Sequence, residues 1–191
     1  SISDSCLGCL IDPCVRVDYL RRMSTLRTSR LTLLQASRED AAFIFELLNS
    51  PTWLEHIGDR GIKTEEDALG YIDKSLVQTY EKFGFGLMKM VHSDSGRDIG
   101  LCGLLKRDYL DFPDIGFAVL PEFEGRGYTF EMAKEILEAE RKRGVYPQIL
   151  AITTDNNTRS RALLEKLGLS YVEHISIPKD SEKLRLYSIR F

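Results

Sequence analysis

The sequence contains no long hydrophobic run, and no segment approaches the roughly 18 consecutive apolar residues that a membrane-spanning helix needs. It also lacks a strong charge of either sign, because 26 Lys and Arg residues stand against 29 Asp and Glu residues, for a formal net charge of −3. Such a balance gives no overall attraction to nucleic acid or to an anionic membrane. We therefore expect neither of them as a partner.

Cysteine is scarce and unevenly placed. Cys6, Cys9 and Cys14 crowd the first segment, and Cys102 stands alone in an expected strand. The Cys6-x-x-Cys9 pair resembles half of a zinc site, but a second ligand pair is missing, so we expect no bound metal. Cys102 is a candidate for acylation in principle, although a buried strand thiol is usually inert. This use of cysteine fits a reducing, cytoplasmic setting.

The first 22 residues lack the basic start and the long apolar segment of a signal peptide. Met23 then opens a segment that reads like a natural start. We expect residues 1–22 to be an extension outside the core and residues 23–191 to form one domain. A chain of 191 residues that is 43% hydrophobic can bury a sufficient core without disulfides or metals.

Strands and helices are interspersed along that domain. Ser37-x-x-Asp40 and Thr64-x-x-Asp67 are capping-box-like signals, each followed by apolar residues at helical spacing. Short turns between the middle strands favour a mixed sheet flanked by helices over a purely parallel one. Strands are expected at 31–34, 84–92, 98–106, 114–120, 149–153, 171–177 and 184–191, and helices after Ser37, after Thr64, at 128–143 and at 158–167.

The most informative stretch joins the strand that ends at Leu120 to the helix that begins at Tyr128. Pro121 breaks the strand, and Gly125 and Gly127 let the backbone approach a ligand closely. Unpaired amides at a helix start, together with the helix dipole, bind phosphate groups. A tight strand-to-helix turn with no ligand remains the alternative. The glycine spacing matches neither a dinucleotide-binding fingerprint nor a Walker A loop.

Three segments together resemble the GCN5-related N-acetyltransferase (GNAT) superfamily. Glu122-Phe-Glu-Gly125-Arg-Gly127 is similar to its acetyl-CoA loop, usually Gln/Arg-x-x-Gly-x-Gly/Ala, and departs from it at the first position. Residues 157–168 (Asn-Thr-Arg-Ser-Arg-Ala-Leu-Leu-Glu-Lys-Leu-Gly) resemble the family's Asn-x-x-Ser…Leu-Glu-Lys-Leu-Gly helix. The opening strand from Leu26 to Leu33 looks like that of the RimJ/RimL-type branch. The resemblance covers about residues 26–191.

The resemblance implies an α/β (α+β) fold with a mostly antiparallel sheet of six to seven strands and about four flanking helices. The fourth and fifth strands would splay apart to form the acetyl-CoA cleft. It implies acetyl transfer from this co-substrate to an amine, either a protein N-terminus or a small molecule, by a monomer or homodimer. Backbone amides near Val119 and Leu120 would hold the pantetheine and the developing oxyanion. The implied coenzyme-binding residues are Ala118, Val119, Leu120, Gly125, Arg126, Gly127, Tyr128, Thr129, Asn157 and Ser160.

Several polar residues are candidates for proton transfer. Asp114 matches an acidic position in related enzymes and is our first choice for general base, acting through a water, with a turn residue after Pro113 as the alternative. Glu122 is the second choice, against simple solvent exposure. His56 and His174 are further possible proton carriers, although a lone histidine is more often structural or exposed.

The helix that begins after Asn157 offers two more candidates. Asn157 is a pantetheine ligand, a helix N-cap, or both. Ser160 is either the proton donor to the leaving thiolate or an ordinary first-turn serine. Many relatives place a tyrosine acid where Leu164 stands, so that acid is missing here. Its absence leans toward the alternative function, a non-catalytic acyl-CoA-binding sensor or scaffold.

The acceptor side is less defined by the sequence. Arg60, Lys106 and Arg107 either line the acceptor mouth and attract an acidic partner or are solvated charges. Trp53, Leu54 and Ile57 are apolar residues that suit an open protein-binding groove or a closed small-molecule pocket equally well.

Overall fold

The structure, a computed structural model, describes residues 26–177 and 183–191. The predicted extension 1–22 and its three cysteines lie outside the described residues. The strands are β1 (Leu31–Leu34), β2 (Leu87–His92), β3 (Asp98–Leu105), β4 (Asp114–Val119), β5 (Gln148–Thr153), β6 (Ser170–Ser176) and β7 (Lys183–Arg190). The helical segments are η1 (Arg38–Asp40), α2 (Ala41–Leu48), α3 (Pro51–His56), α4 (Glu65–Tyr71), η2 (Ile72–Val77), α5 (Gln78–Phe83), η3 (Pro121–Phe123), α6 (Tyr128–Arg143) and α7 (Thr158–Lys166).

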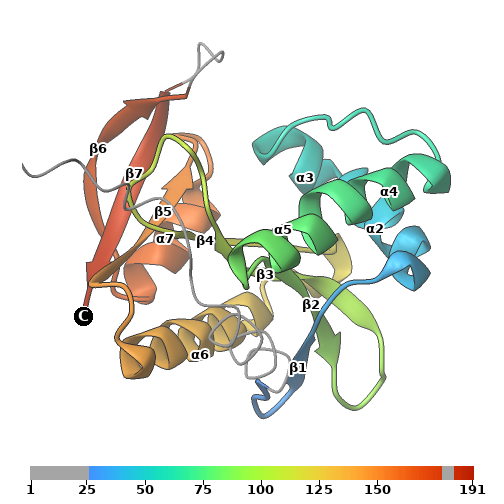
Figure 1. The fold of residues 1–191 in the computed structure, drawn as a ribbon, viewed down its shortest axis with the longest axis horizontal. Helices are drawn as coiled ribbons and strands as arrows, with labels where there is room; N and C mark the ends of the chain where they lie inside the picture. The colour runs from blue at the N-terminus through green and yellow to red at the C-terminus, as the bar shows by residue number, and fades with distance from the viewer. Residues whose placement is uncertain (1–25, 178–182) are drawn as a thin grey trace, which may run out of the picture.

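The seven strands form one sheet in the order β1-β2-β3-β4-β5-β7-β6. Every neighbouring pair is antiparallel except β4 and β5, which are parallel. This pair is joined at one register position, Asp114 opposite Leu150, beside a hydrogen bond from the Leu150 N–H to the Pro113 carbonyl (2.9 Å). Figure 1 shows β4 running between the group α2–α5 and the group formed by α7 and β5–β7. The predicted mixed sheet and its splay between the fourth and fifth strands are therefore confirmed.

Helix α6 has the bounds that the sequence predicted. It begins after Gly127 and ends before Gly144, whose φ of 65° places it in the left-handed conformation that ends many helices. Met132, Ala133 and Ile136 are fully buried on its inner face. That face packs against β1, β3 and β4, so the start of α6 is fixed beside the end of β4.

The helix predicted after Thr64 is continuous but contains a wider turn. Thr64 caps α4, and its hydroxyl accepts a hydrogen bond from the Asp67 N–H (3.1 Å). The residues buried along this helix, Ala68, Ile72, Leu76 and Tyr80, recur every fourth position. In an α-helix of 3.6 residues per turn, residues spaced four apart gradually rotate around the helix and would leave the core-facing side. The wider turn of the π-helical η2 rotates the row in the opposite sense, so all four residues face the core. Counting α4, η2 and α5 as one helix gives five helices besides the short 3₁₀ turns in the described chain.

Three details differ from the sequence-based expectation. The strand expected from residue 84 begins at Leu87, because Gly84, with a φ of 76°, ends α5 first. Helix α3 was not predicted; it starts with Pro51 directly after the short loop that ends α2. The connection between β3 and β4, residues 106–113, is a loop rather than a short turn, and Leu110 anchors it in a small second core with Leu150 and Leu186.

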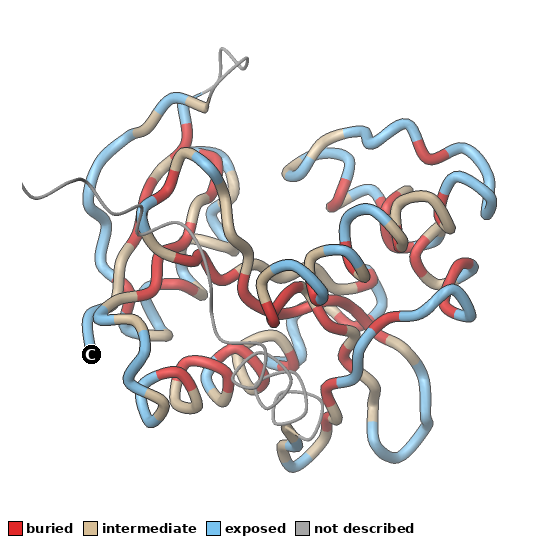
Figure 2. The backbone as a smooth tube through the Cα atoms, viewed as in Figure 1, coloured by how far each residue is buried: buried red, intermediate tan, exposed pale blue. Residues whose placement is uncertain are grey.

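The main core lies between the sheet and the helices, where Figure 2 shows buried backbone along the central strands and the inner helix faces. The edge strand β6 is exposed along almost its whole length, with Ile175 half-buried. No helix among residues 26–177 and 183–191 combines the length and the apolar character required to cross a bilayer.

Candidate active site

The segment after η3 forms an open backbone loop at the start of α6. Gly125 and Gly127 have φ values of 71° and 78°, which residues other than glycine rarely adopt. A Cβ built on Gly125 would meet no atom within 4 Å, so the backbone there faces open space. The capping bond of α6 runs from the Glu131 N–H to the Gly127 carbonyl (3.0 Å), and the amides before Glu131 have no partner one turn back. This loop has the form of an anion-binding cradle, and it suits a diphosphate.

The side chains that pack around Tyr128 stabilise the loop. The Tyr128 ring is buried against Phe123 and His92, with centroids 6.1 and 5.5 Å away, and the Arg30 guanidinium lies 4.4 Å above it. Arg30 also donates to the carbonyl of Arg126 (3.0 Å). Tyr128 is therefore placed to offer its backbone amide to a ligand. Arg126 is exposed, so its side chain can reach a phosphate.

Strand β4 presents alternate amides to the opening. The Leu120 N–H donates to the Ile99 carbonyl of the β3 side (2.8 Å), so this amide already has a strand partner. Successive amides of a strand point to opposite edges, which directs the amides of Phe117 and Val119 toward β5. The β4–β5 pairing ends near Asp114 and does not reach them. Of the predicted residues Ala118, Val119 and Leu120, only Val119 directs its amide toward β5, because the amides of Ala118 and Leu120 face β3. The Leu120 carbonyl accepts from the Phe123 N–H (2.9 Å), and Phe117, which the sequence did not single out, has the same orientation as Val119. Coenzyme binding by these residues stays a prediction.

The start of α7 forms the opposite wall. The Asn157 side-chain oxygen accepts a hydrogen bond from the Ser160 N–H (3.0 Å), which is the N-cap arrangement. The amide nitrogen of Asn157 has no hydrogen-bond partner among the described residues, so capping leaves it available to a ligand. Ser160 is half-buried, and Leu164 is packed in the core. The N-cap role of Asn157 is established, and its role toward the coenzyme stays a prediction.

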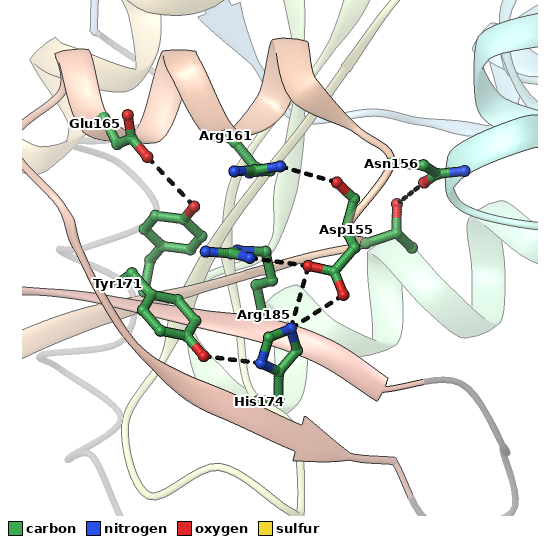
Figure 3. Close-up of polar contacts among 9 residues, drawn as sticks. Asp155, Asn156, Arg161, Glu165, Tyr171, His174 and Arg185 are labelled. Atoms are coloured by element: carbon green, nitrogen blue, oxygen red, sulfur yellow. Dashed lines mark hydrogen bonds and ion pairs between the residues drawn. The ribbon is translucent and has the colours of Figure 1, made fainter.

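A polar cluster holds the turn between β5 and α7 in place (Figure 3). Asp155 in this turn receives a hydrogen bond from Arg185 of β7 (2.9 Å) and contacts the Nε2 atom of His174 of β6 (3.0 Å). The other ring nitrogen of His174 contacts the Tyr171 hydroxyl (2.8 Å), and Arg161 of α7 donates to the Asp155 carbonyl (3.1 Å). Hydrogen bonds from Arg185 and then His174 hold the pKa of Asp155 below its ordinary value. The cluster ties α7 to the β6–β7 hairpin, and both ring nitrogens of His174 are engaged in it, so its role as a proton carrier stays a prediction.

Asp114 lies at the start of β4 with 1% of its surface exposed. Both of its oxygens accept from the Nε of Arg107, at 3.0 and 3.1 Å. Burial raises the pKa of Asp114 above its ordinary value, while the nearby Arg107 opposes that rise. A carboxyl with a raised pKa is a better proton acceptor at neutral pH than an exposed one. The turn-residue alternative does not describe this ion-paired strand residue.

The basic residues of the expected acceptor side differ in what they contact: Lys106 binds carbonyls of its own loop, whereas Arg60 and Arg107 lie near Tyr71. The Lys106 ammonium donates to the carbonyls of Leu110 (2.6 Å) and Arg107 (3.3 Å) and so stabilises its own loop. Arg60 is exposed and, like Arg107, acts on the phenol of Tyr71: burial raises the Tyr71 pKa, and the two guanidinium charges oppose the rise. Tyr71 was missed at the sequence level, because its helical spacing indicated only a packed face.

The remaining candidates, Glu122 and the residues of α3, have surroundings that are less suitable for proton transfer. Glu122 is exposed and paired with Arg97 (2.9 Å), and a hydrogen bond from its own backbone N–H, then that of Arg97, lowers its pKa. This makes it a weaker base than Asp114. On α3, Trp53 is buried, and neither its Nε1 nor the Nδ1 of His56 has a hydrogen-bond partner within the part of the chain that the structure describes. Leu54 is exposed on the same helix.

The thiol of Cys102 is buried in β3, and burial raises its pKa to about 12. At pH 8 the thiol is therefore almost entirely protonated, and it is also inaccessible. We expect iodoacetamide at pH 8 to leave Cys102 unmodified in the folded protein and to alkylate it fully in guanidinium chloride. Peptide mass spectrometry reports this cysteine separately from the other three. Rapid alkylation of Cys102 in the folded state would show that β3 opens, and would return the thiol to the list of possible nucleophiles.

Comparisons with known proteins show the family and the fold of this chain. Residues 30–170 match the family model of the acetyltransferase (GNAT) domain. The chain is 26% identical over 144 residues to the uncharacterised N-acetyltransferase YnaD of Bacillus subtilis (strain 168), covering 75% of this chain and 81% of that protein. The crystal structure of an acetyltransferase from Agrobacterium tumefaciens str. C58 superposes with a TM-score of 0.72 at 24% identity, covering 87% and 94% of the two chains. RimL, a ribosomal L7/L12 α-N-protein acetyltransferase in complex with coenzyme A, has the same fold with a TM-score of 0.72 at 12% identity, covering 87% and 97%.

Proposed function

This chain belongs to the GNAT acetyltransferase family, whose members are acetyl-CoA-dependent acyltransferases, and we propose that it transfers the acetyl group to a primary amine by direct attack on the thioester. The observation that carries the proposal is the parting of β4 from β5 beyond Asp114, next to the open glycine loop of α6. The parted strands leave the amides of Phe117 and Val119, two half-buried residues, without a partner on β5, so these amides are free to donate to a ligand. The pantetheine arm supplies acceptors of this kind.

Each wall of the opening has a distinct task in this proposal. The glycine loop and the first amides of α6 hold the diphosphate, and the Asn157 amide nitrogen donates to the pantetheine arm. The Val119 N–H is placed to stabilise the oxyanion that forms when the amine attacks. These contacts orient the thioester, so that a large part of the rate enhancement comes from positioning.

Proton transfer is assigned to two side chains. Asp114 takes the proton of the substrate ammonium through a water, which leaves the neutral amine that acts as nucleophile. Arg107 fixes the carboxylate in one orientation through its two contacts to Asp114. The Ser160 hydroxyl donates a proton to the departing thiolate, since Leu164 offers no acidic group. The serine regains a proton from the attacking nitrogen, which loses it as the amide forms.

The acceptor is an amine on a protein N-terminus or on a small molecule. The exposed guanidinium of Arg60 and the charge of Arg107 act on the same phenol, that of Tyr71. Because Arg107 is already paired with Asp114, the charge that remains for an acceptor is that of Arg60, which favours an acceptor that carries a negative group near its amine. We also propose that this chain belongs to the RimJ/RimL-type branch of the family and is located in the cytoplasm.

An acceptor screen tests the function. Calorimetry with acetyl-CoA and a thiol-release assay are run side by side with N-terminal peptides, polyamines and amino acids as acceptors. We expect tight coenzyme binding and turnover above the hydrolysis background on at least one amine. Binding without turnover on any acceptor would support the non-catalytic acyl-CoA-binding module, which the lack of a tyrosine at Leu164 favours. Absence of coenzyme binding would refute both.

A further inference from the structure

The carboxylate of Glu124 joins three elements around the proposed coenzyme site. Glu124 lies between η3 and Gly125, inside the glycine loop. One of its oxygens accepts a hydrogen bond from the Thr52 hydroxyl of α3 (2.5 Å), and the other forms an ion pair with Arg159 of α7. Neither contact was foreseen from the sequence, because the three residues are far apart along the chain.

The Glu124–Arg159 pair spans the two walls of the opening at the level of the diphosphate cradle. Glu124 immediately precedes Gly125, whose backbone faces open space. Arg159 is in the first turn of α7, two residues after Asn157. The Glu124 side chain is 18% exposed, whereas that of Arg159 is 78% exposed. The guanidinium is therefore the more exposed member of the pair, and it extends from the start of α7 toward the loop.

Arg159 has donors to spare. Its NH1 atom contacts Glu124, and no other acceptor for its side chain occurs among the described residues. A guanidinium has five N–H donors in a planar fork that matches phosphate oxygens, and a single carboxylate contact uses only part of this capacity. A diphosphate in the glycine loop would offer a stronger and doubly charged partner within reach of the same side chain.

We propose, building on the proposed function, that Arg159 is a ligand of the coenzyme diphosphate and that Glu124 competes with the diphosphate for it. Coenzyme binding transfers the guanidinium from the carboxylate to the phosphate oxygens. The Thr52 hydroxyl keeps Glu124 hydrogen-bonded after Arg159 has left, so the half-buried carboxylate is not left without a partner. Glu124 therefore lowers the affinity for the coenzyme, both by occupying Arg159 and by its own charge.

The test is calorimetry with three probes: coenzyme A, dephospho-coenzyme A, which lacks the 3′-phosphate, and S-acetylpantetheine, which lacks all phosphates. Arg159→Gln is expected to weaken the first two by roughly tenfold, the scale of one lost charge-assisted hydrogen bond, and to leave the third unchanged. Glu124→Gln is expected to tighten the first two by roughly fivefold. In the double variant most of this gain should disappear, because Glu124 acts through Arg159.

Two controls separate this exchange from a simple change of charge. Glu122→Gln removes the same charge two residues earlier, in η3, but alters a pair with Arg97, which directly precedes β3, so it should tighten binding much less than Glu124→Gln. Arg159→Lys keeps the charge without the planar fork and should recover only part of the affinity. Equal effects of the two glutamate variants, or unchanged affinity in Arg159→Gln, would overturn the proposal. A loss confined to coenzyme A would assign Arg159 to the 3′-phosphate instead and overturn it as well, whereas failure of the unmodified protein to bind coenzyme A would refute the proposed function itself.

Discussion

Gly125→Glu is expected to abolish high-affinity acetyl-CoA binding, with a loss of roughly 100-fold or more. The new side chain would point into the open space above the loop, where the diphosphate is expected. Its bulk would displace the phosphate oxygens from the backbone amides, and its carboxylate would repel them. Loss of two charge-assisted hydrogen bonds alone costs about 3 kcal/mol, which corresponds to the stated factor. Isothermal titration calorimetry with acetyl-CoA measures this directly.

Gly96→Glu is a matched control for this variant. Gly96 has a φ of 68°, close to the 71° of Gly125, and a Cβ built there also meets nothing within 4 Å. It lies in the turn between β2 and β3, next to Arg97, and is not itself part of the glycine loop. Both variants thus carry the same backbone strain and the same added charge, and they differ only in location. The expected result is a similar loss of melting temperature in both and a loss of coenzyme affinity only at Gly125.

The proposal that the glycine loop binds the coenzyme is wrong if both glycine variants bind acetyl-CoA as well as the unmodified protein does. A loss of affinity in both would point to strain or net charge rather than to a blocked cradle. Because S-acetylpantetheine has no diphosphate, it offers a further check: its weaker binding should be far less affected by Gly125→Glu than the binding of acetyl-CoA.

The elements that the sequence predicted well are those whose ends carry local chemical signals. Helix α6 begins and ends beside glycines in the left-handed conformation, and Thr64 caps α4 through contacts three residues away. Such signals act between neighbours in the chain, so they can be recognised without knowing the fold. The loop motif and the segment from Asn157 to Gly168 belong to the same class, since their spacing is fixed within one strand–helix unit.

The parts that the sequence did not predict depend on contacts between distant segments. The partner of Asp114 is Arg107, and this pairing requires the path that the loop 106–113 takes across Leu150 and Leu186. The ion pair between Glu124 and Arg159 likewise requires that the fold bring the glycine loop close to the start of α7. Residue type and spacing indicated that these side chains were candidates for function. They did not indicate which charged side chains pair with one another.

Asp114→Asn is the second substitution with a large expected effect, a decrease of roughly 100-fold or more in kcat with little change in acetyl-CoA affinity. The size follows from the usual contribution of a general base, about 10²–10⁴-fold. Asparagine keeps the shape of the side chain but cannot take a proton from the substrate ammonium. Initial rates measured with saturating acceptor, combined with calorimetry for the coenzyme, separate the two parameters.

The variant also leaves Arg107 beside a neutral group, so a control for this loss is needed. Asp40→Asn provides it, because Asp40 is similarly buried, with 7% of its surface exposed, and pairs with Lys89 (2.6 Å) of β2, a strand that borders neither β4 nor β5. Both substitutions should lower the free energy of unfolding by about 1–3 kcal/mol, the cost of removing one partner of a buried polar contact. Only Asp114→Asn should lower kcat, provided that assays are run well below the melting temperature.

The pH dependence of the rate decides whether Asp114 is the base or merely stabilises the strand. Asp114 acts as a base only when ionised, so the rate of the unmodified enzyme must fall as the pH falls through the pKa of Asp114. Burial raises this pKa above the ordinary aspartate value of 3.8, so the acid limb lies at higher pH than for an exposed aspartate. Asp114→Asn should remove that limb and retain only the limb that reports deprotonation of the acceptor amine. An unchanged acid limb in the variant, even with a reduced rate, would assign the proton transfer to another group and reduce Asp114 to a partner that positions Arg107.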